Sequence, residues 1–330
     1  MRATPFTFRS IEDLELGPKW SALFAELWPR YSAWFLSEGE EARVSFATSS
    51  RMLRAHMPEL YPTYERLVEL AGGGDLAARM LSIYSPPPYL AACSQGAWTR
   101  GGPMLVRNYD YAPSLLEGVV LSSHMLERRV IGMSDCLWGL LDGMNDAGLA
   151  VSLTFGGRRA LGDGFGIPLV LRYVLETCST VDEAREVLAR LPYNLAHNLT
   201  LIDGDGRVLT AYLSPDREPV FAAFPAATNH QGLVEWPEQA RATRTVERER
   251  RIVQLLQKPD LPPEAFADAF LDPPLYSTAY ASGFGTLFTS VYRPADGRAW
   301  YRWPSYAWEQ SFDRFVEGTH EEVLAEGSVA

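Results

Sequence analysis

The sequence predicts an α+β fold in which two antiparallel sheets lie between layers of helices. Three observations predict it. Of the 330 residues 47% are hydrophobic, which is enough for a sizeable core. Short strand-like runs form two sets, one beginning near residue 89 and one near residue 198. Helix-like segments lie before, between and after these sets, without the strict strand–helix alternation of a doubly wound sheet.

The first part of the chain, residues 1–92, is predicted to be a helical segment. Over residues 10–83, apolar residues recur at intervals of three and four with charges between them, which indicates helices. The sequence SPPPY at residues 85–89 ends this region, because proline neither continues a helix nor fits a central strand.

The rest of the chain, residues 93–330, carries the two strand sets and the helices between them. The first predicted strands cover residues 89–98, 103–111, 118–126, 129–133, 136–145 and 148–155. The second set covers residues 198–213, 218–229, 285–294 and 298–304. Helices are predicted at 166–178, 180–191 and 237–257, and Thr180 with Glu183 forms a capping box at the start of the second.

Composition excludes several classes of function. A net charge of −11 and a pI near 5.0 leave no basic face for nucleic acid or anionic membranes. The first 20 residues lack the apolar core of a secretory signal, and no run approaches the length of a membrane span, so a cytoplasmic location is expected. Clustered metal ligands and a phosphate-binding glycine loop are both missing from the sequence, so we expect no metal and no cofactor.

The three cysteines are odd in number and widely spaced, so they predict neither a disulfide framework nor a zinc site. Cys136 and Cys178 are interpreted as packing residues. Cys93 differs because a glycine pair, Gly101-Gly102, follows it as a favoured two-residue hairpin turn. That turn pairs Cys93 with Asp110, which places a carboxylate beside the thiol.

The same register sends Arg107 to the opposite face of the hairpin from Cys93, unless a bulge re-aims it. A thiol is nucleophilic only as the thiolate, so Cys93 needs a base or a positive neighbour. One possibility is a papain-like arrangement with His197 or His230. The other is that Cys93 becomes the N-terminus of a mature chain, so that its own α-amine serves as the base.

Several motifs together resemble a known family. In order, they are CSQGAW, VRNYDY, DGMNDAGLAVSLTF, HNLTLIDGDG, AATNH and GTLFTSVYRP. They are similar to the penicillin acyltransferase-like enzymes and, more distantly, to the choloylglycine hydrolases. The resemblance runs from about Cys93 to Trp303 and implies the four-layer αββα fold of the N-terminal-nucleophile hydrolases.

The resemblance implies that Cys93 is the nucleophile, freed by cleavage of the Ala92–Cys93 bond. Arg107 and Asp110 match the Arg-x-x-Asp of the family. Asp110 would hold the new α-ammonium, and Arg107 would lower the thiol pKa or orient the amine. Ala92 stands where the relatives most often have glycine.

The resemblance also supplies two donors for the tetrahedral oxyanion. Asn229, in the sequence TNH, matches the asparagine whose amide donates to it, and the backbone N–H of Thr154 matches the second donor. Such preorganised donors are usually the largest catalytic contribution. The bile salt hydrolases carry asparagine at the Thr154 position, and their late-strand arginine has no match near Ser290.

Further residues are expected around the substrate. Asn108 shares the face of Asp110, Trp98 and Trp138 are candidates for an acyl pocket, and His230 follows Asn229. The charged run 241–251, by contrast, is interpreted as a solvated helix face with an ion pair between Glu247 and Arg251.

Together these features predict an autoprocessed cysteine amidohydrolase or acyltransferase. It would act on the linear amide of an N-acylated small molecule or peptide through a thioester on Cys93, which water or another acyl acceptor then resolves. Residues 1–92 would stay bound as a small subunit to the catalytic residues 93–330. A non-catalytic, unprocessed relative that binds an acylated metabolite or a protein partner is the alternative.

Overall fold

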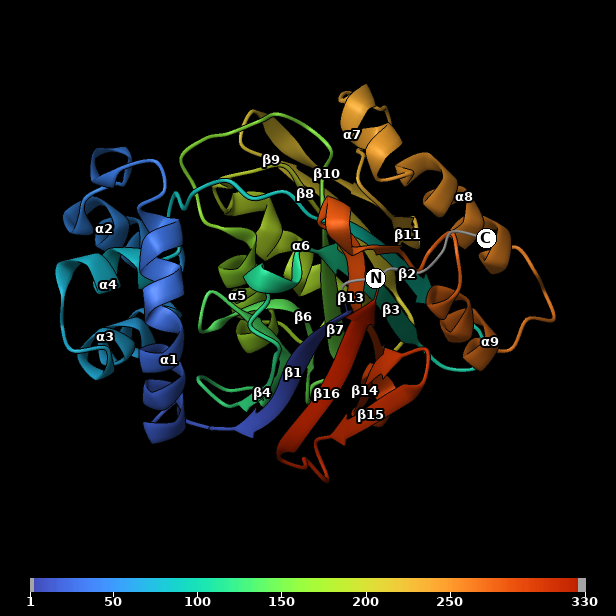
Figure 1. The fold of residues 1–330 in the computed structure, drawn as a ribbon, viewed down its shortest axis with the longest axis horizontal. Coiled ribbons are helices and arrows are strands. Elements are labelled where there is room, and N and C mark those ends of the chain that lie inside the picture. Colours follow the sequence, from blue (N-terminus) through green and yellow to red (C-terminus); the bar gives the residue numbers. More distant parts are fainter. Residues whose placement is uncertain (1–2, 326–330) are drawn as a thin grey trace.

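Two β-sheets stack face to face in the computed structural model, which describes residues 3–325, and helices cover both outer sides (Figure 1). Helices α5 and α6 lie on one side of this pair, and α8 and α9 lie on the other. The α+β prediction with two stacked, largely antiparallel sheets is therefore confirmed.

The first sheet has nine strands in the order β10-β9-β8-β7-β6-β5-β4-β1-β16. Neighbours are antiparallel except β1 and β4, which run parallel. The strands are β1 (Ala3–Glu12), β4 (Val119–Ser123), β5 (Val130–Asp135), β6 (Gly139–Asn145), β7 (Leu149–Phe155), β8 (His197–Asp203), β9 (Val208–Ser214), β10 (Arg217–Ala222) and β16 (Gly318–Ala325). Strands β6 and β7 are buried along their whole length, as expected for strands covered on both faces.

The second sheet has seven strands in the order β11-β2-β3-β13-β14-β15, with β12 paired to β13. The strands are β2 (Ala92–Trp98), β3 (Met104–Tyr111), β11 (Ala226–Ala227), β12 (Thr278–Ala279), β13 (Phe284–Arg293), β14 (Arg298–Trp303) and β15 (Tyr306–Ser311). Strand β2, which carries the candidate nucleophile, lies between β3 and β11.

The outer helices cover the two sheets. They are α5 (Ile167–Thr177), α6 (Val181–Arg190), α7 (Pro237–Ala242), α8 (Thr245–Leu256) and α9 (Pro263–Asp268). The predicted cap at the start of α6 is present, because the Thr180 hydroxyl accepts from the Glu183 N–H at 3.2 Å, whereas the Glu183 carboxylate accepts from the N–H of Ser179, one residue before the N-cap. The single helix predicted over 237–257 is divided at Arg244, whose φ of 53° is left-handed.

The N-terminal segment is not purely helical, which corrects the prediction for residues 1–92. It forms β1 and then α1 (Pro18–Phe35), α2 (Phe46–His56), α3 (Tyr61–Leu70) and α4 (Asp75–Leu81). The four helices form a separate cluster at one side of the molecule (Figure 1), whereas β1 lies inside the first sheet between β4 and β16. Phe8 of β1 is fully buried and its ring contacts Trp303, with 4.6 Å between ring centroids.

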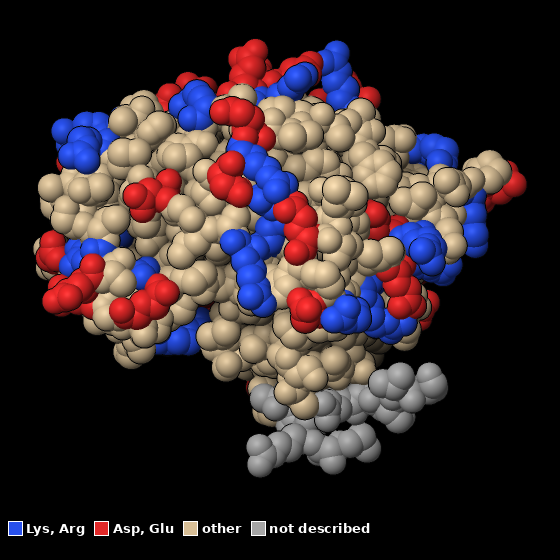
Figure 2. Space-filling view, turned by 90° about the horizontal axis from the view of Figure 1, so that it is seen from above, with Lys and Arg blue, Asp and Glu red and all other residues tan. Residues whose placement is uncertain are grey.

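Two hydrophobic cores hold the layers together. The larger lies between the sheets and beneath α1–α5, and the smaller lies between the second sheet and the helices α8 and α9. On the surface, acidic and basic side chains are interspersed over the face shown in Figure 2, and no extended basic patch gathers there. Among the helices of residues 3–325, none is long and apolar enough to cross a membrane.

Candidate active site

Cys93 is the second residue of β2, and its side chain is fully buried. The hairpin register differs from the predicted one, because Cys93 pairs with Tyr109 and Asp110 pairs with Ala92. The paired strands end at Trp98 and Met104, so five residues form the turn. A two-residue turn would need an N–H from Pro103, which proline lacks.

This one-residue shift decides which side chains share a face. Residues that pair directly point the same way, so the side chains of Cys93 and Tyr109 lie on one face together with Gln95 and Arg107. The Arg107 side chain therefore lies on the same face as the thiol without a bulge, and Asp110 lies on the opposite face.

Arg107 is fully buried and contacts the thiol, with 3.5 Å between its Nη2 and the Cys93 Sγ. Two neighbours in the first sheet fix the guanidinium. Its Nη1 pairs with Asp142 at 2.5 Å, and its Nε donates to the Leu153 carbonyl at 2.8 Å. The hydroxyl of Tyr292 donates to the other oxygen of Asp142. Asp142 is the first residue of the motif DGMNDAGLAVSLTF, but the sequence alone assigned it no role.

The electrostatics at the thiol act in opposite directions. Burial raises the pKa of Cys93, the positive charge of Arg107 lowers it, and the carboxyl of Asp110 raises it. Arg107 is therefore the main group that favours the thiolate.

Asp110 lies on the outer face of the second sheet, beneath helix α8. Its Oδ1 accepts from the Thr286 hydroxyl at 2.7 Å, and its Oδ2 lies 3.6 Å from the guanidinium of Arg248. Burial raises the pKa of Asp110 to about 6, and Arg248 opposes this increase. This carboxyl is therefore close to the main chain of Ala92 and Cys93 rather than to the thiol.

Arg248 corrects the interpretation of residues 241–251 as a solvated helix face, because it is 2% exposed. Its Nη1 donates to the Cys93 carbonyl at 2.5 Å and to the Ser94 hydroxyl at 2.7 Å, and its Nη2 donates to Asn229 Oδ1 at 2.6 Å. Glu247, expected to pair with Arg251, pairs with Arg244 instead.

Helical spacing was the signal that could have identified Arg248. It stands four and seven residues before Ile252 and Leu255, which are both buried, and so it lies on the apolar stripe of α8. A guanidinium in such a stripe needs buried acceptors, and the active site supplies them.

Asn229 contacts the main chain on both sides of Ala92, the residue before the predicted cleavage site. Its Oδ1 accepts from the Cys93 N–H at 3.0 Å, and its Nδ2 lies 3.4 Å from the Ala91 carbonyl oxygen and 3.0 Å from the Phe155 carbonyl oxygen, to both of which it donates. The contacts with Ala91 and Cys93 fall on either side of Ala92.

Thr154, near the end of β7, supports the loop that carries Asn229. Its hydroxyl donates to the Thr228 carbonyl at 2.8 Å, and Asn198, its partner on β8, donates to the same carbonyl at 2.8 Å. Its role through the backbone N–H stays a prediction.

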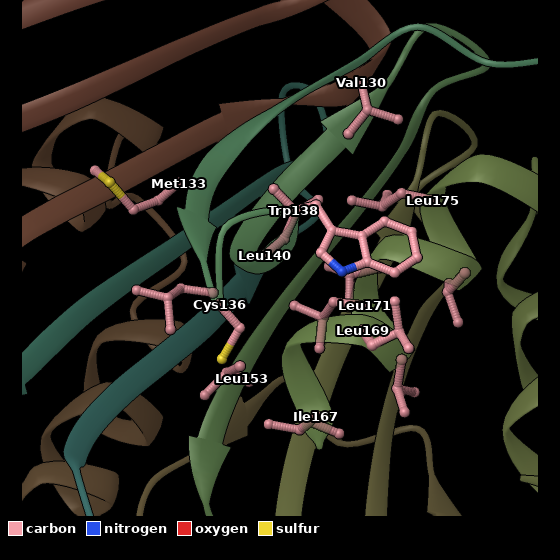
Figure 3. Close-up of a cluster of buried hydrophobic side chains, with 14 of the residues drawn as sticks. Val130, Met133, Cys136, Trp138, Leu140, Leu153, Ile167, Leu169, Leu171 and Leu175 are labelled. Carbon is pink, nitrogen blue, oxygen red and sulfur yellow. The ribbon is translucent and has the colours of Figure 1, made fainter. Parts of the chain in front are cut away.

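The predicted substrate-binding residues lie in different places. Asn108 donates to the carbonyls of Phe270 and Leu275 and accepts from Thr289, so its amide is fully engaged on the outer face. Trp98 packs against Phe266 in the smaller core. Trp138 lies among leucines in the larger core (Figure 3), and its Nε1 donates to the Leu81 carbonyl.

The two candidate histidines have other partners. His230 pairs with Glu249 at 3.2 Å and contacts the Thr245 hydroxyl. His197 packs against the ring of Tyr89, and burial lowers its pKa to about 4. Within residues 3–325, no hydrogen bond joins either histidine to Cys93, so the geometry of a papain-like pair is not present there.

A partly open pocket reaches the hairpin beside Cys93. It is lined by Arg30, Tyr31, Trp34, Tyr89, Tyr109, Tyr111, Leu115, Asp135 and Cys136. Tyr109 is the strand partner of Cys93, and Cys136 lines this pocket although it was interpreted as a packing residue. Helix α1 supplies Arg30, Tyr31 and Trp34, so the N-terminal segment forms one wall. The part of the chain described here contains no cluster of side chains suited to a metal ion.

Comparison with solved structures supports the fold. Penicillin V acylase from Agrobacterium tumefaciens matches with a TM-score of 0.51 at 17% identity, over 67% of this chain and 87% of that one. The conjugated bile acid hydrolase of Clostridium perfringens gives a TM-score of 0.40 at 13% identity, over 70% and 96% of the two chains. An N-acylethanolamine-hydrolyzing acid amidase ortholog of Caenorhabditis elegans gives a TM-score of 0.45 at 16% identity, over 62% of this chain and 93% of that one.

The first of these likenesses shows that the two chains share a fold. No curated protein matches the sequence significantly. The model of one family, described as acyl-coenzyme A:6-aminopenicillanic acid acyl-transferase, matches residues 98–308. This span begins after Cys93. It includes Arg107, Asp110, Thr154, Asn229 and Arg248. Because this match covers more than half of the chain, the chain belongs to the acyl-coenzyme A:6-aminopenicillanic acid acyl-transferase family.

Proposed function

We propose that the chain is an autoprocessed cysteine amidohydrolase or acyltransferase whose nucleophile is Cys93. The contact between Arg107 and the Cys93 thiol is the observation that carries this proposal. A fixed guanidinium beside a buried thiol favours the thiolate, and among the described residues no guanidinium is hydrogen-bonded to the thiol of Cys136 or Cys178, whose partners are Asp135 and Thr177.

The processing step follows from the position of the thiol next to its own peptide bond. The Cys93 sulfur attacks the Ala92 carbonyl carbon, the bond from that carbon to the Cys93 nitrogen breaks, and the nitrogen takes a proton to become a free α-amine. Water then hydrolyses the thioester, which leaves a carboxylate on Ala92 and the free thiol on Cys93. Asn229 holds both sides of this bond, so it restrains the peptide while the sulfur attacks.

Cleavage also changes what Asn229 is free to do. In the uncleaved chain its Nδ2 donates to the Ala91 carbonyl, which cleavage frees to move away because Ala92 is then a chain end. The released N–H then becomes available for a substrate oxyanion, with the Thr154 backbone N–H as the second donor. Arg248 donates to Asn229 Oδ1 and so keeps the amide in the orientation that presents Nδ2.

In the mature enzyme, the α-amine of Cys93 takes the proton of the thiol, the thiolate attacks the carbonyl carbon of a linear amide, and the α-ammonium so formed gives its proton to the leaving amine. The thioester is then resolved by water or by an acyl acceptor such as an amine or a thiol. Asp110 lies near the main chain of Ala92 and Cys93, a position from which its carboxylate can hold the new ammonium.

We also propose that residues 1–92 stay bound after cleavage. Strand β1 pairs with β16 and β4 within the first sheet, and Tyr31 of α1 bonds to Glu117 and to the backbone N–H of Cys136. The pairing of β1 is extensive and the bonds of Tyr31 are buried, so the fragment is expected to remain as a small subunit.

Intact mass spectrometry tests the proposal. Wild-type protein should give two chains that separate between Ala92 and Cys93, and Cys93→Ala should give one chain near 36.8 kDa. Cys178→Ala is the matched control and should be cleaved like the wild type. Full amidase activity in a single intact chain would contradict the N-terminal-nucleophile mechanism, and an inert, intact wild-type chain would favour a non-catalytic relative.

A further inference from the structure

Two buried carboxyl groups that the proposed reaction does not use lie at the pocket beside Cys93: Asp135 lines it, and Glu117 bonds to Tyr31 of its wall. Glu117 is 3% exposed and Asp135 is 9% exposed. The hydroxyl of Tyr31 lies between them, bonded to Glu117 Oε1 and 3.2 Å from Asp135 Oδ1. The Leu137 N–H also donates to Glu117 Oε1 at 2.6 Å, whereas Glu117 Oε2 has no partner within residues 3–325.

In the described chain neither of these carboxyl groups forms an ion pair. Arg30 lines the same pocket, and its Nη1 donates to the main-chain carbonyls of Ser114 and Leu116. Its Nη2 is buried without a partner among the described residues, and its charge opposes the increase in the pKa of Asp135 that burial and Glu117 cause. Burial and the neighbouring Glu117 raise the pKa of Asp135 to about 7. Two buried carboxyl groups with no ion pair form an environment that a bound cation would stabilise.

Most of the pocket wall is aromatic. Tyr31, Trp34, Tyr89, Tyr109 and Tyr111 line it, and the face of an aromatic ring attracts a cation. The Tyr89 hydroxyl is buried without a partner among the described residues, so one polar group of the wall is available to a ligand. A cavity volume of about 40 Å³ leaves room for a small polar group beside the carboxyl pair.

The processing reaction indicates which part of a substrate enters this pocket. In that reaction the acyl group is the chain that ends at Ala92, and Tyr89, three residues earlier, already lines the pocket. The path from the thiol along the acyl group therefore leads to the aromatic wall and to Asp135.

We propose that this pocket binds a protonated amine carried by the acyl part of the substrate, so that the substrate is an amide of an amino-bearing carboxylic acid. The ammonium lies against the aromatic rings and pairs with Asp135, and Glu117 adds to its attraction. The pocket assignment rests on the carboxyl pair and the rings, whereas the assignment to the acyl part rests on the proposed function.

Binding to the uncleaved protein tests the pocket without catalysis. Calorimetry on the Cys93→Ala variant would compare pentylammonium, 1-pentanol and pentanoate. We expect pentylammonium to bind at least about tenfold more tightly than 1-pentanol, because only the ammonium gains a buried charge partner. Equal affinities would overturn the proposal, and so would tighter binding of pentanoate, which would assign the pocket to Arg30.

Two substitutions on the Cys93→Ala background locate the effect. Asp135→Asn should remove the preference for pentylammonium, and Glu117→Gln, which leaves Asp135 in place, should reduce it. Asp313→Asn replaces an exposed carboxylate elsewhere and should keep the preference. A preference that survives both pocket substitutions would overturn the assignment, once circular dichroism has shown that the variants are folded.

Kinetics on the processed enzyme separate this inference from the proposed function. A series of p-nitroanilides with ω-aminoacyl groups would be compared with acyl groups of equal length that end in methyl. We expect kcat/KM to favour the amine by at least about tenfold at one chain length, and Asp135→Asn to bring the ratio near one. Cleavage without preference for the amine would contradict the inference alone. Binding of pentylammonium without cleavage of any amide would contradict the proposed function alone.

Discussion

The main-chain carbonyl of Cys93 accepts a hydrogen bond from Nη1 of Arg248 at 2.5 Å. The same guanidinium holds Asn229 Oδ1 and faces the Asp110 carboxylate. One side chain of helix α8 therefore connects the candidate nucleophile, the candidate oxyanion donor and the carboxylate beside the cleavage site.

Replacing Arg248 should impair both folding and processing. Arg248→Met leaves Asp110 buried without its nearest cation, which is expected to cost about 3 kcal/mol of unfolding free energy in urea denaturation. Self-cleavage, followed by mass, should slow as Asn229 loses its restraint, and Arg248→Lys should restore part of the rate. Arg250→Met, at an exposed position of the same helix, is the control and should change neither. Wild-type cleavage in Arg248→Met would contradict the positioning role.

Replacing Arg107 should move the pH dependence of the reaction. The guanidinium lowers the pKa of Cys93, so Arg107→Met should shift the acid limb of the kcat/KM profile upward by about one pH unit or more. If the variant accumulates as precursor, the pH profile of self-cleavage serves as the measurement. Arg107→Lys keeps the charge and should shift the limb less. A lower rate with an unmoved pH midpoint would instead indicate a purely structural role.

Asp135 should make the protein less stable as the pH rises. The pKa of Asp135 is about 7 in the folded protein against 3.8 for an ordinary aspartate, so between these values the folded state holds a proton that the unfolded state has lost. Raising the pH from 4 to 7 therefore favours unfolding. Asp135→Asn should remove this loss. The change in unfolding free energy from pH 4.5 to pH 8 should therefore be more favourable in the variant than in the wild type by on the order of 2 kcal/mol. Urea unfolding at both pH values measures it, and the curves for Asp313→Asn should follow the wild type.

Strand β1 should contribute strongly to stability. Phe8 is fully buried between the sheets, against Trp303 and Phe288, so Phe8→Ala should lower the unfolding free energy by about 3–5 kcal/mol. Phe46→Ala, at a side chain that is 42% exposed, is the matched control and should change it little. Equal effects of the two substitutions would show that β1 is peripheral.

The sequence predicted most of the fold because its strands and helices are locally consistent. The runs around β2 to β7 are short, apolar and bounded by turns, and Thr180 caps α6 as expected. Strand β1 was missed because residues 1–92 were interpreted as one helical segment, although Phe6 and Phe8 alternate with polar residues in the manner of a strand.

The site was harder to predict because it depends on register and on long-range contacts. The glycine pair indicated a turn but not that Pro103 would lengthen it, and this single residue decides that Arg107 rather than Asp110 lies beside the thiol. The pairing of Arg107 with Asp142 joins two different sheets, and no local pattern encodes it. Arg248 shows that a charged residue on an apolar helix stripe is better interpreted as a buried contact than as a solvated one.

The place of β1 inside the first sheet has a consequence for folding. Cleavage after Ala92 would place β1 on a different chain from its neighbours β4 and β16, although the three strands remain paired. Before the cut, refolding is a reaction of one chain and does not depend on protein concentration. After the cut it requires two chains to meet, so the unfolded mature protein would recover only at a rate that depends on concentration. The mature protein would thus obtain its folded state from the precursor. It would keep that state because it unfolds slowly, and not because its two chains refold readily.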